Sequence, residues 1–118
     1  MVNFYKTAGA VITPIEEAVD DCWVNLVNPT EDEINSVSEK LDLDIGFVKA
    51  ALDEEETSRV ETDNNQTLII IDIPYVQKQN NLVSYETIPL GIIIASKHII
   101  TVCLKETSTS CMYIKDTV

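Results

Sequence analysis

The sequence predicts an α/β fold, a mixed β-sheet of about six strands flanked by helices. Uninterrupted runs of branched aliphatic residues, such as Leu68–Ile71 and Ile92–Ala95, are typical of buried strands. Between residues 30 and 52, apolar residues instead recur every three or four positions, which predicts helices. The resulting order is strand, strand, helix, helix and then about four strands, and this order favours helices packed on a sheet.

The first predicted elements are two strands. We expect a short strand over Val2–Thr7, followed by a turn-rich connection over Gly9–Pro14, because glycine and proline both favour turns. Cys22–Val27 predicts the second strand, which carries the only tryptophan of the chain, Trp23. Pro29 follows shortly afterwards and ends this strand.

Two helices are predicted next, each with its own capping residue. Residues 30–33 form a capping box, in which the Thr30 hydroxyl and the Glu33 carboxylate each accept from the other residue's backbone N–H. The apolar face of the first helix consists of Ile34, Val37 and Leu41. Asp44 caps the second helix, which we expect to end in the acidic run Asp53–Glu56. Its apolar face consists of Phe47, Val48, Ala51 and Leu52.

The rest of the chain is predicted to form strands joined by tight turns. We expect the turns over residues 63–65, which read Asp-Asn-Asn, over the polar segment 77–81, and at Ser96 and Lys97. Pro74 should end or bulge the strand over Thr67–Ile73, because proline cannot donate to a ladder, and Pro89 is a point where the strand over Leu82–Ala95 could be interrupted. The strands themselves are expected over Ser58–Glu61, Thr67–Ile73, Leu82–Ala95 and His98–Leu104. No element is assigned to Lys105–Val118.

Composition restricts the class of protein. The 118 residues suit a single domain over 1–118, and 45% hydrophobic residues can form a core. Eight basic against 20 acidic residues give a net charge of −12, which repels nucleic acid and attracts cations. Three cysteines without a paired spacing (Cys22, Cys103 and Cys111) suit a reducing cytosol. The N-terminus has no signal-peptide pattern, and no apolar run approaches the roughly 20 residues that span a bilayer.

Catalytic residues are scarce, and we therefore predict that the protein is not an enzyme. The single histidine, His98, lies beside a predicted turn, where a structural role is more common than a catalytic one. Three glycines cannot build a phosphate-binding loop. Asp42–Asp53 has the length of a calcium loop, but Phe47 occupies the sixth position, where glycine is needed. We expect no catalytic residue and no tightly bound cofactor.

The acidic run Asp53–Glu56 is the candidate for a cation contact. Four carboxylates at the C-terminal end of a helix oppose the helix dipole, so the run suggests either Mg²⁺, which prefers carboxylate oxygens, or pairing with Arg59. The sequence leaves both alternatives open, and the metal-ligating residues stay unknown. Other carboxylates are explained by solubility and helix capping, namely Asp20, Asp21, Glu31 and Asp32.

Several segments over residues 22–104, taken in this order, resemble the N-terminal domain of the CorA family of divalent-cation transporters. The tryptophan strand and the capped first helix are one such segment, and the acidic helix end followed by Arg59-Val60-Glu61 is another. The paired apolar strands that end in Ile99-Ile100-Thr101-Val102 complete the pattern. The quoted segments are Trp23–Leu26, Asn28–Ile34, Leu52–Glu56, Ser58–Glu61, Leu68–Pro74, Ile88–Ile94 and Ile99–Val102.

This resemblance implies a function and a cellular location. Family members are homopentameric channels for Mg²⁺, and often for Co²⁺ or Ni²⁺, whose α/β/α domain lies on the cytoplasmic side of the cell membrane. Mg²⁺ bound between neighbouring domains holds the pore closed. The family's stalk, membrane helices and Gly-Met-Asn signature are missing here, so we expect a soluble fragment, with residues 105–118 beginning a truncated segment. The loop where the gating carboxylate is expected reads Gln77-Lys78-Gln79-Asn80. The alternative is a stand-alone α/β module for ligand binding or oligomerisation.

Overall fold

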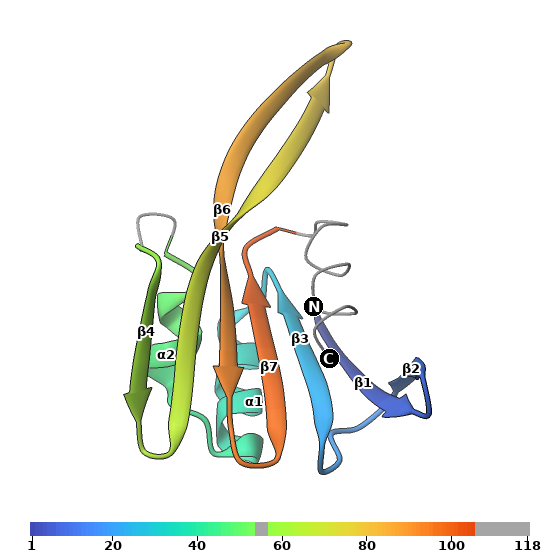
Figure 1. The fold of residues 1–118 in the computed structure, drawn as a ribbon, viewed down its shortest axis with the longest axis vertical. Coiled ribbons are helices and arrows are strands. Elements are labelled where there is room, and N and C mark those ends of the chain that lie inside the picture. The colour runs from blue at the N-terminus through green and yellow to red at the C-terminus, as the bar shows by residue number, and fades with distance from the viewer. Residues whose placement is uncertain (54–56, 106–118) are drawn as a thin grey trace.

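The computed structural model describes residues 1–53 and 57–105, which form a seven-stranded sheet with two helices (Figure 1). The spatial order of the strands is β2-β1-β3-β7-β6-β5-β4. This architecture confirms the predicted α/β class, with seven strands in place of about six. The elements are β1 (Val2–Ala8), β2 (Val11–Ile15), β3 (Cys22–Val27), α1 (Glu31–Leu41), α2 (Ile45–Ala50), β4 (Arg59–Asp63), β5 (Gln66–Gln79), β6 (Leu82–Ile94) and β7 (His98–Cys103).

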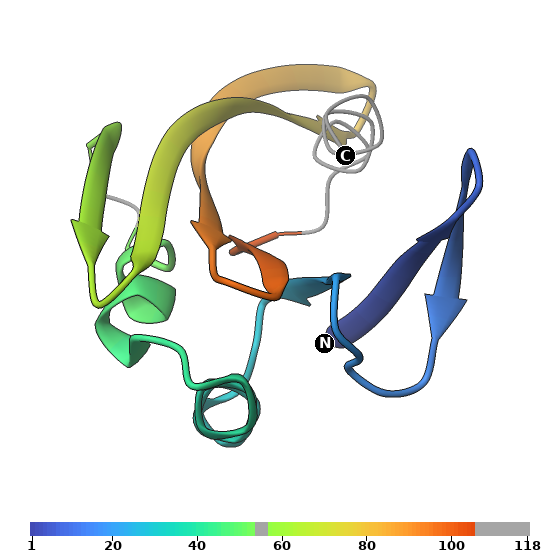
Figure 2. The ribbon, with the colours of Figure 1, turned by 60° about the horizontal axis from the view of Figure 1, so that its bottom comes forward.

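The sheet is mixed because its two central strands run parallel. β3 and β7 pair in parallel from Cys22 opposite His98 to Val27 opposite Cys103, and the other five strand pairs are antiparallel. The helices lie in the connection between these two strands, as expected for a parallel pair. Figure 2 shows α1 and α2 on the same side of the sheet.

Local contacts explain where both helices begin. The Glu33 backbone N–H donates to Thr30 Oγ1 at 3.2 Å, and the Thr30 N–H donates to Glu33 Oε1 at 2.9 Å, which confirms the capping box. The α-amino group of Met1 also donates to Glu33 Oε1, at 3.1 Å. Asp44 caps α2 as predicted, because its Oδ1 accepts from the Gly46 N–H at 2.9 Å.

The core lies between the helices and one face of the sheet. Ile34 and Val37 of α1 and Phe47 and Val48 of α2 are buried against the central strands. α2 approaches the sheet very closely at Gly91, since a Cβ added there would lie 2.3 Å from Ala51 Cβ. The strand residues in this cluster are Cys22, Val24, Leu26, Leu68, Ile70, Ile93, Ile100 and Val102.

A second apolar cluster lies on the opposite face. It consists of Ile73, Ile88, Leu90 and Cys103, with Ile71, Tyr75 and Ile92 packed against it. The chain leaves β7 beside this cluster, where Lys105 Nζ lies 4.8 Å from the centre of the Tyr75 ring. The unassigned tail, 106–118, lies outside the described residues.

Two hairpins turn through consecutive asparagines. Asn64 and Asn65 join β4 to β5, and Asn80 and Asn81 join β5 to β6, all four with positive φ. Two-residue hairpin loops of type I′ require positive φ at both positions, and asparagine tolerates this conformation better than most residues. The predicted turn at 63–65 is therefore confirmed, and the turn predicted over 77–81 is shorter than expected, since β5 continues to Gln79.

The prediction of a turn-rich connection over Gly9–Pro14 is wrong. Only Gly9 and Ala10 turn, and Val11–Ile15 forms β2, which pairs with β1 from Ala8 opposite Val11 to Phe4 opposite Ile15. Pro14 favoured a turn in the prediction because proline is rare in central strands. In the described sheet β2 lies at the edge, where a missing N–H is tolerated.

The prediction that Pro74 ends or bulges a strand is also wrong. β5 continues through Pro74, which pairs with Thr87, and β6 continues through Pro89, which pairs with Asp72. The reason is the length of the neighbouring strands: β4 pairs with β5 only as far as Ile70, and β7 pairs with β6 only as far as Leu90. At both prolines, therefore, the strand pairs with one neighbouring strand rather than with two, and a missing N–H is tolerated there.

The second helix is shorter than predicted. α2 ends at Ala50, with Ala51 as its C-cap, so Leu52 and Asp53 follow the helix instead of forming its last turn. The expected strand over Ser58–Glu61 is displaced by a residue or two, since β4 spans Arg59–Asp63. Residues 54–56 of the acidic run lie outside the described part of the chain.

Candidate functional site

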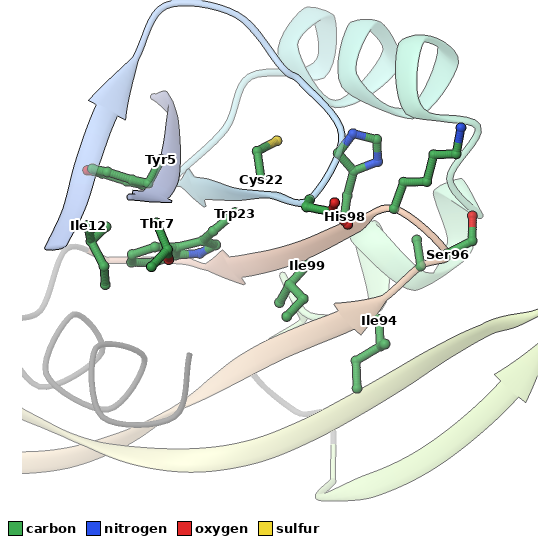
Figure 3. Close-up of a pocket in the computed structure, with 12 residues that line it drawn as sticks. Tyr5, Thr7, Ile12, Cys22, Trp23, Ile94, Ser96, His98 and Ile99 are labelled. Carbon is green, nitrogen blue, oxygen red and sulfur yellow. The ribbon is translucent and has the colours of Figure 1, made fainter. Parts of the chain in front are cut away.

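A cavity of about 290 Å³ lies at the end of the sheet where β3 begins and β6 turns into β7 (Figure 3). Asp21, with φ of 63°, places β3 beside this turn, and its N–H donates to Lys97 O at 2.6 Å. Cys22 and His98 point to the helix side of the sheet, whereas Ile94 and Ile99 point to the other side. The cavity therefore wraps around the end of the sheet. We call it the sheet-end cavity.

The wall of the sheet-end cavity is mainly apolar and aromatic. The rings of Tyr5 and Trp23 are packed with centroids 4.6 Å apart and planes tilted by 30°. The polar groups lie at the hairpin end, where Lys97 Nζ is 3.5 Å from Asp20 Oδ2. This ion pair is mostly solvent-exposed and contributes little stability. Such a lining can take up an apolar or aromatic group.

Behind the wall, three side chains of the central strands form a buried hydrogen-bonded chain. Trp23 Nε1 donates to Thr101 Oγ1 at 2.8 Å, and Thr101 Oγ1 donates to Asn25 Oδ1 at 2.9 Å. Sequence analysis missed this network. The signal was a polar residue inside an otherwise apolar strand, at Asn25 in β3 and again at Thr101 in β7. Its partners could not be foreseen because 76 residues separate Asn25 from Thr101.

The cavity has the residue types of a cysteine–histidine pair but not the accessibility that nucleophilic catalysis needs. Cys22 lies opposite His98 in the ladder. The Cys22 residue is only 2% exposed and belongs to the main apolar cluster. A thiol buried among apolar side chains is a packing group rather than an attacking group.

A second hollow, of about 410 Å³, lies between α1 and the segment that joins β2 to β3. Its floor is apolar, and its rim carries Glu16, Glu17 and Lys40. The two carboxylates and one ammonium group are all on exposed residues. The apolar residues of this hollow are Phe4, Ala18, Val37 and Leu41.

The acidic residues considered in the sequence are dispersed over the structure. Asp20 faces Lys97, Asp21 lines the sheet-end cavity, and Glu31 lies 3.8 Å from Lys49 Nζ. Within residues 1–53 and 57–105, no three His, Cys, Asp or Glu residues gather in a group that could hold a metal ion. Asp53 is exposed, and Glu54–Glu56 lie outside the described residues, so the acidic run is untested as a cation site.

Two further predictions concern residues near this run. Arg59 forms an ion pair with Glu61, in which Arg59 Nε lies 3.3 Å from Glu61 Oε2. The structure, like the sequence, excludes a calcium-binding loop over Asp42–Asp53. Asp42 is the C-cap of α1 and Asp44 is the N-cap of α2, and residues 45–50 between the supposed ligands are helical.

The fold perturbs the ionisation of Glu33. The hydrogen bond from the Thr30 backbone and the bond from the α-amino group of Met1 lower the pKa of Glu33 below its usual 4.5. This carboxylate joins the N-terminus of the chain to the start of α1. Its role is structural, because both of its partners are backbone groups.

Comparison with known proteins supports one family. The family model described as "CorA-like Mg²⁺ transporter protein" matches residues 20–116. A curated relative, the cobalt/magnesium transport protein CorA of Methanocaldococcus jannaschii, is 29% identical over 80 residues. That alignment covers 68% of this chain but only 24% of the relative, so the chain matches about a quarter of that protein.

Solved structures show the same fold. The soluble domain of CorA from Methanocaldococcus jannaschii matches 98% of this chain with a TM-score of 0.75 and 21% identity, and 45% of that chain is covered. The complete CorA magnesium transporter from the same organism matches 99% of this chain with a TM-score of 0.71 and 19% identity, with 36% of it covered. The full-length CmaX protein matches 98% of this chain at a TM-score of 0.66 and 9% identity, with 37% of it covered.

No helix among the described residues is long and apolar enough to cross a membrane. The structural matches cover 98% to 99% of this chain, and so extend over its sheet and its helices. The family match extends over most of the chain, including every strand from β3 to β7. This chain therefore belongs to the CorA-like Mg²⁺ transporter family.

Proposed function

We propose that this chain is the cytoplasmic domain of a CorA-like transporter that carries Mg²⁺ across the cell membrane, with Co²⁺ or Ni²⁺ as further cargo. The observation that carries the proposal is the family match over residues 20–116, together with the fold shared with the soluble domain of CorA. The chain matches a quarter of the curated relative, so the membrane-crossing part is itself a proposal. The domain acts as part of a homo-oligomer, a pentamer in the complete transporter.

The domain's part in transport is regulatory rather than chemical. The net charge of −12 concentrates divalent cations at the surface, and it also makes nucleic acid an unfavourable partner. The buried thiol of Cys22 argues against nucleophilic catalysis. Mg²⁺ is proposed as a regulatory ligand, held weakly by this domain, with no tightly bound cofactor.

The first test is calorimetric titration of Mg²⁺ and Co²⁺ into the purified chain. A variant with Asp53, Glu54 and Glu56 changed to alanine removes the acidic run. A matched control changes three dispersed carboxylates, Glu17, Glu39 and Glu86, and so removes the same charge. Saturable binding that is lost in the first variant and kept in the control supports a regulatory site at the acidic run. Equal losses in both variants indicate diffuse attraction, and contradict a site there.

The second test addresses transport itself. Cells that lack the gene for this chain should take up Mg²⁺ more slowly, and they should grow poorly when Mg²⁺ is scarce. Supplying the gene again should restore both. Unchanged uptake in the deletion strain, with no other Mg²⁺ carrier induced, contradicts the proposed role in transport.

The second candidate function is a stand-alone module for ligand binding or oligomerisation. The observation that favours it is the sheet-end cavity, whose volume of about 290 Å³ is close to the lower limit of small-molecule sites. Binding of a small aromatic compound would quench or shift the fluorescence of Trp23, the only tryptophan. A saturable fluorescence change, combined with normal Mg²⁺ uptake in the deletion strain, would favour this alternative over the transporter.

A further inference from the structure

A hollow of about 410 Å³ lies between α1 and segment 16–21, which joins β2 to β3. Figure 2 shows α1 and this segment on the same side of the sheet. The volume of the hollow is in the lower part of the range of small-molecule sites. We call it the α1 hollow. Its lining comes from β1, from the segment and from α1, so the fold brings together parts of the chain that are distant in the sequence.

The floor of the α1 hollow is apolar and belongs to the core. Val37 of α1 is only 6% exposed. Phe4, Ala18 and Leu41 are partly buried and pack against the main apolar cluster. Phe4 lies opposite Val24 in the ladder, and Val24 is fully buried on the helix side. Such a floor can take up an aliphatic or aromatic group, because moving apolar surface out of water is favourable.

The rim of the α1 hollow carries charges of both signs on its two sides. Glu16 and Glu17 lie on the segment, and Lys40 lies in the last turn of α1. All three residues are exposed. The ion pairs found among the described residues include none of the three. Two carboxylates on one side and an ammonium group on the other are therefore available to a ligand.

The two carboxylates are attached to an anchored part of the backbone. Ile15 precedes the pair and Ala18 follows it, and both of these apolar residues pack against the main cluster. The segment is therefore held on each side of Glu16 and Glu17, although both residues are exposed. Holding the backbone in place before binding lowers the conformational entropy that a ligand has to offset.

We propose that the α1 hollow binds an apolar α-amino acid. The side chain of the ligand lies on the apolar floor, its ammonium group faces Glu16 and Glu17, and its carboxylate faces Lys40. The net charge of −12 disfavours an anion, and Lys40 disfavours a ligand that is only a cation, whereas a zwitterion matches both sides of the rim. None of these residues belongs to the acidic run Asp53–Glu56, so the inference goes beyond the proposed contact with Mg²⁺.

The test is a chemical-shift titration of the isotope-labelled chain with three probes that share one apolar body, in buffer without divalent cations. L-phenylalanine carries both charges, 2-phenylethylamine carries only the ammonium group, and 3-phenylpropionate carries only the carboxylate. The methyl signals of Ala18, Val37 and Leu41 should shift and saturate with phenylalanine. Each of the other two probes should have a dissociation constant about threefold higher or more, because it lacks one contact between opposite charges.

Substitutions on the rim test which side binds which charge. Glu16→Gln with Glu17→Gln should weaken the binding of phenylalanine about threefold, and should strengthen the binding of 3-phenylpropionate because two repelling carboxylates are gone. Lys40→Gln should weaken the binding of 3-phenylpropionate and strengthen that of 2-phenylethylamine. The matched control, Glu39→Gln with Glu86→Gln, removes two exposed carboxylates outside the hollow and should leave the order of the three probes unchanged.

Three results would overturn the proposal. The first is a set of methyl signals on the floor that phenylalanine does not shift, and the second is a probe with one charge that binds the wild type as tightly as phenylalanine does. The third is a control variant that loses as much affinity for phenylalanine as the Glu16 and Glu17 variant. The first two results come from the wild type and do not depend on a variant folding. Mg²⁺ uptake by cells is a separate readout, so failure of this site and failure of the transport role are distinguishable.

Discussion

At the scale of single residues, two threonine hydroxyls fix parts of the fold that apolar packing leaves undetermined. Thr30 sets the start of α1 through its bond with the Glu33 backbone. Thr101 joins Trp23 and Asn25 across the parallel pair of strands. A slip by one residue would turn Thr101 to the helix side, where the neighbouring side chains are apolar. The network therefore specifies the register of β3 against β7.

Replacing Thr101 with valine should destabilise the protein by about 2 kcal/mol, because the buried Trp23 N–H and the Asn25 carbonyl oxygen both lose a partner. Valine has nearly the same shape, so the loss reports the hydrogen bonds rather than packing. Thr101→Ser keeps the hydroxyl and should lose less. Urea denaturation measures both changes, and equal losses for the two variants would contradict the role of the network.

Replacing Thr30 with alanine should cost about 1 kcal/mol of unfolding free energy, the usual contribution of an N-cap. Thr30→Ser retains the capping oxygen and should be close to the wild type. Thermal denaturation followed by circular dichroism compares the three proteins. An alanine variant as stable as the serine variant would show that the capping box contributes no stability.

Stability at acidic pH should depend on Glu33. The fold lowers the pKa of this carboxyl below 4.5, so the folded state favours the charged form. The contribution is present above the unfolded pKa, and is lost as the pH falls through the lower pKa of the folded state. Glu33→Gln cannot ionise, so its melting temperature should fall less below about pH 4.5 than that of the wild type. Glu39→Gln, at an exposed position of the same helix, is the control for the loss of one carboxylate.

At the scale of elements, the close approach of α2 to β6 depends on a missing side chain. A Cβ at position 91 would lie 2.3 Å from Ala51 Cβ, inside any allowed carbon–carbon contact. The conformation of Gly91 is not the constraint, since its φ is not positive. The constraint is space, and it fixes how near the end of α2 lies to the sheet.

Gly91→Ala should therefore destabilise the chain by about 1 to 3 kcal/mol, the usual cost of overpacking a core. Adding Ala51→Gly removes the opposing Cβ and should recover part of the loss. A double-mutant cycle by urea denaturation separates this coupling from the intrinsic cost of glycine at position 51. Additive losses in the double variant would contradict the steric explanation.

At the scale of the whole molecule, the net charge of −12 makes the folded state repel itself. Salt should therefore raise the melting temperature, because screening acts over about 10 Å at 0.1 M ionic strength. Comparing NaCl with MgCl₂ at equal ionic strength separates screening from binding. An extra rise in MgCl₂ supports a Mg²⁺ site, whereas equal rises would leave screening as the whole effect. A melting temperature that does not change with salt would contradict the self-repulsion.

Much of the local structure could be predicted from the sequence. The capping box at Thr30 and Glu33, the Asp44 cap and the Asn64–Asn65 turn are confirmed, because these contacts join residues at most three positions apart. β3 also has the predicted bounds, Cys22–Val27. The resemblance to the CorA family over residues 22–104 is confirmed as well. The single domain over 1–118 and the cation contact at Asp53–Glu56 stay predictions.

The features that only the tertiary structure decided depend on contacts between residues that are distant in the sequence. β2 was predicted as a turn-rich connection, but it is a strand because β1 pairs with it, and β5 continues through Pro74 because β4 ends before that point. The sheet-end cavity and the Thr101 network likewise follow from the strand order, as does the extension of the β5–β6 hairpin beyond its neighbouring strands. The sequence by itself determined where both helices begin and where the Asn64–Asn65 turn lies, because the helix caps are short-range hydrogen bonds and the turn depends on the conformations that asparagine tolerates. The pairing of strands decided the bounds of the remaining strands. Backbone N–H and C=O groups of a strand form their hydrogen bonds with another strand, and the local sequence does not specify which strand that is.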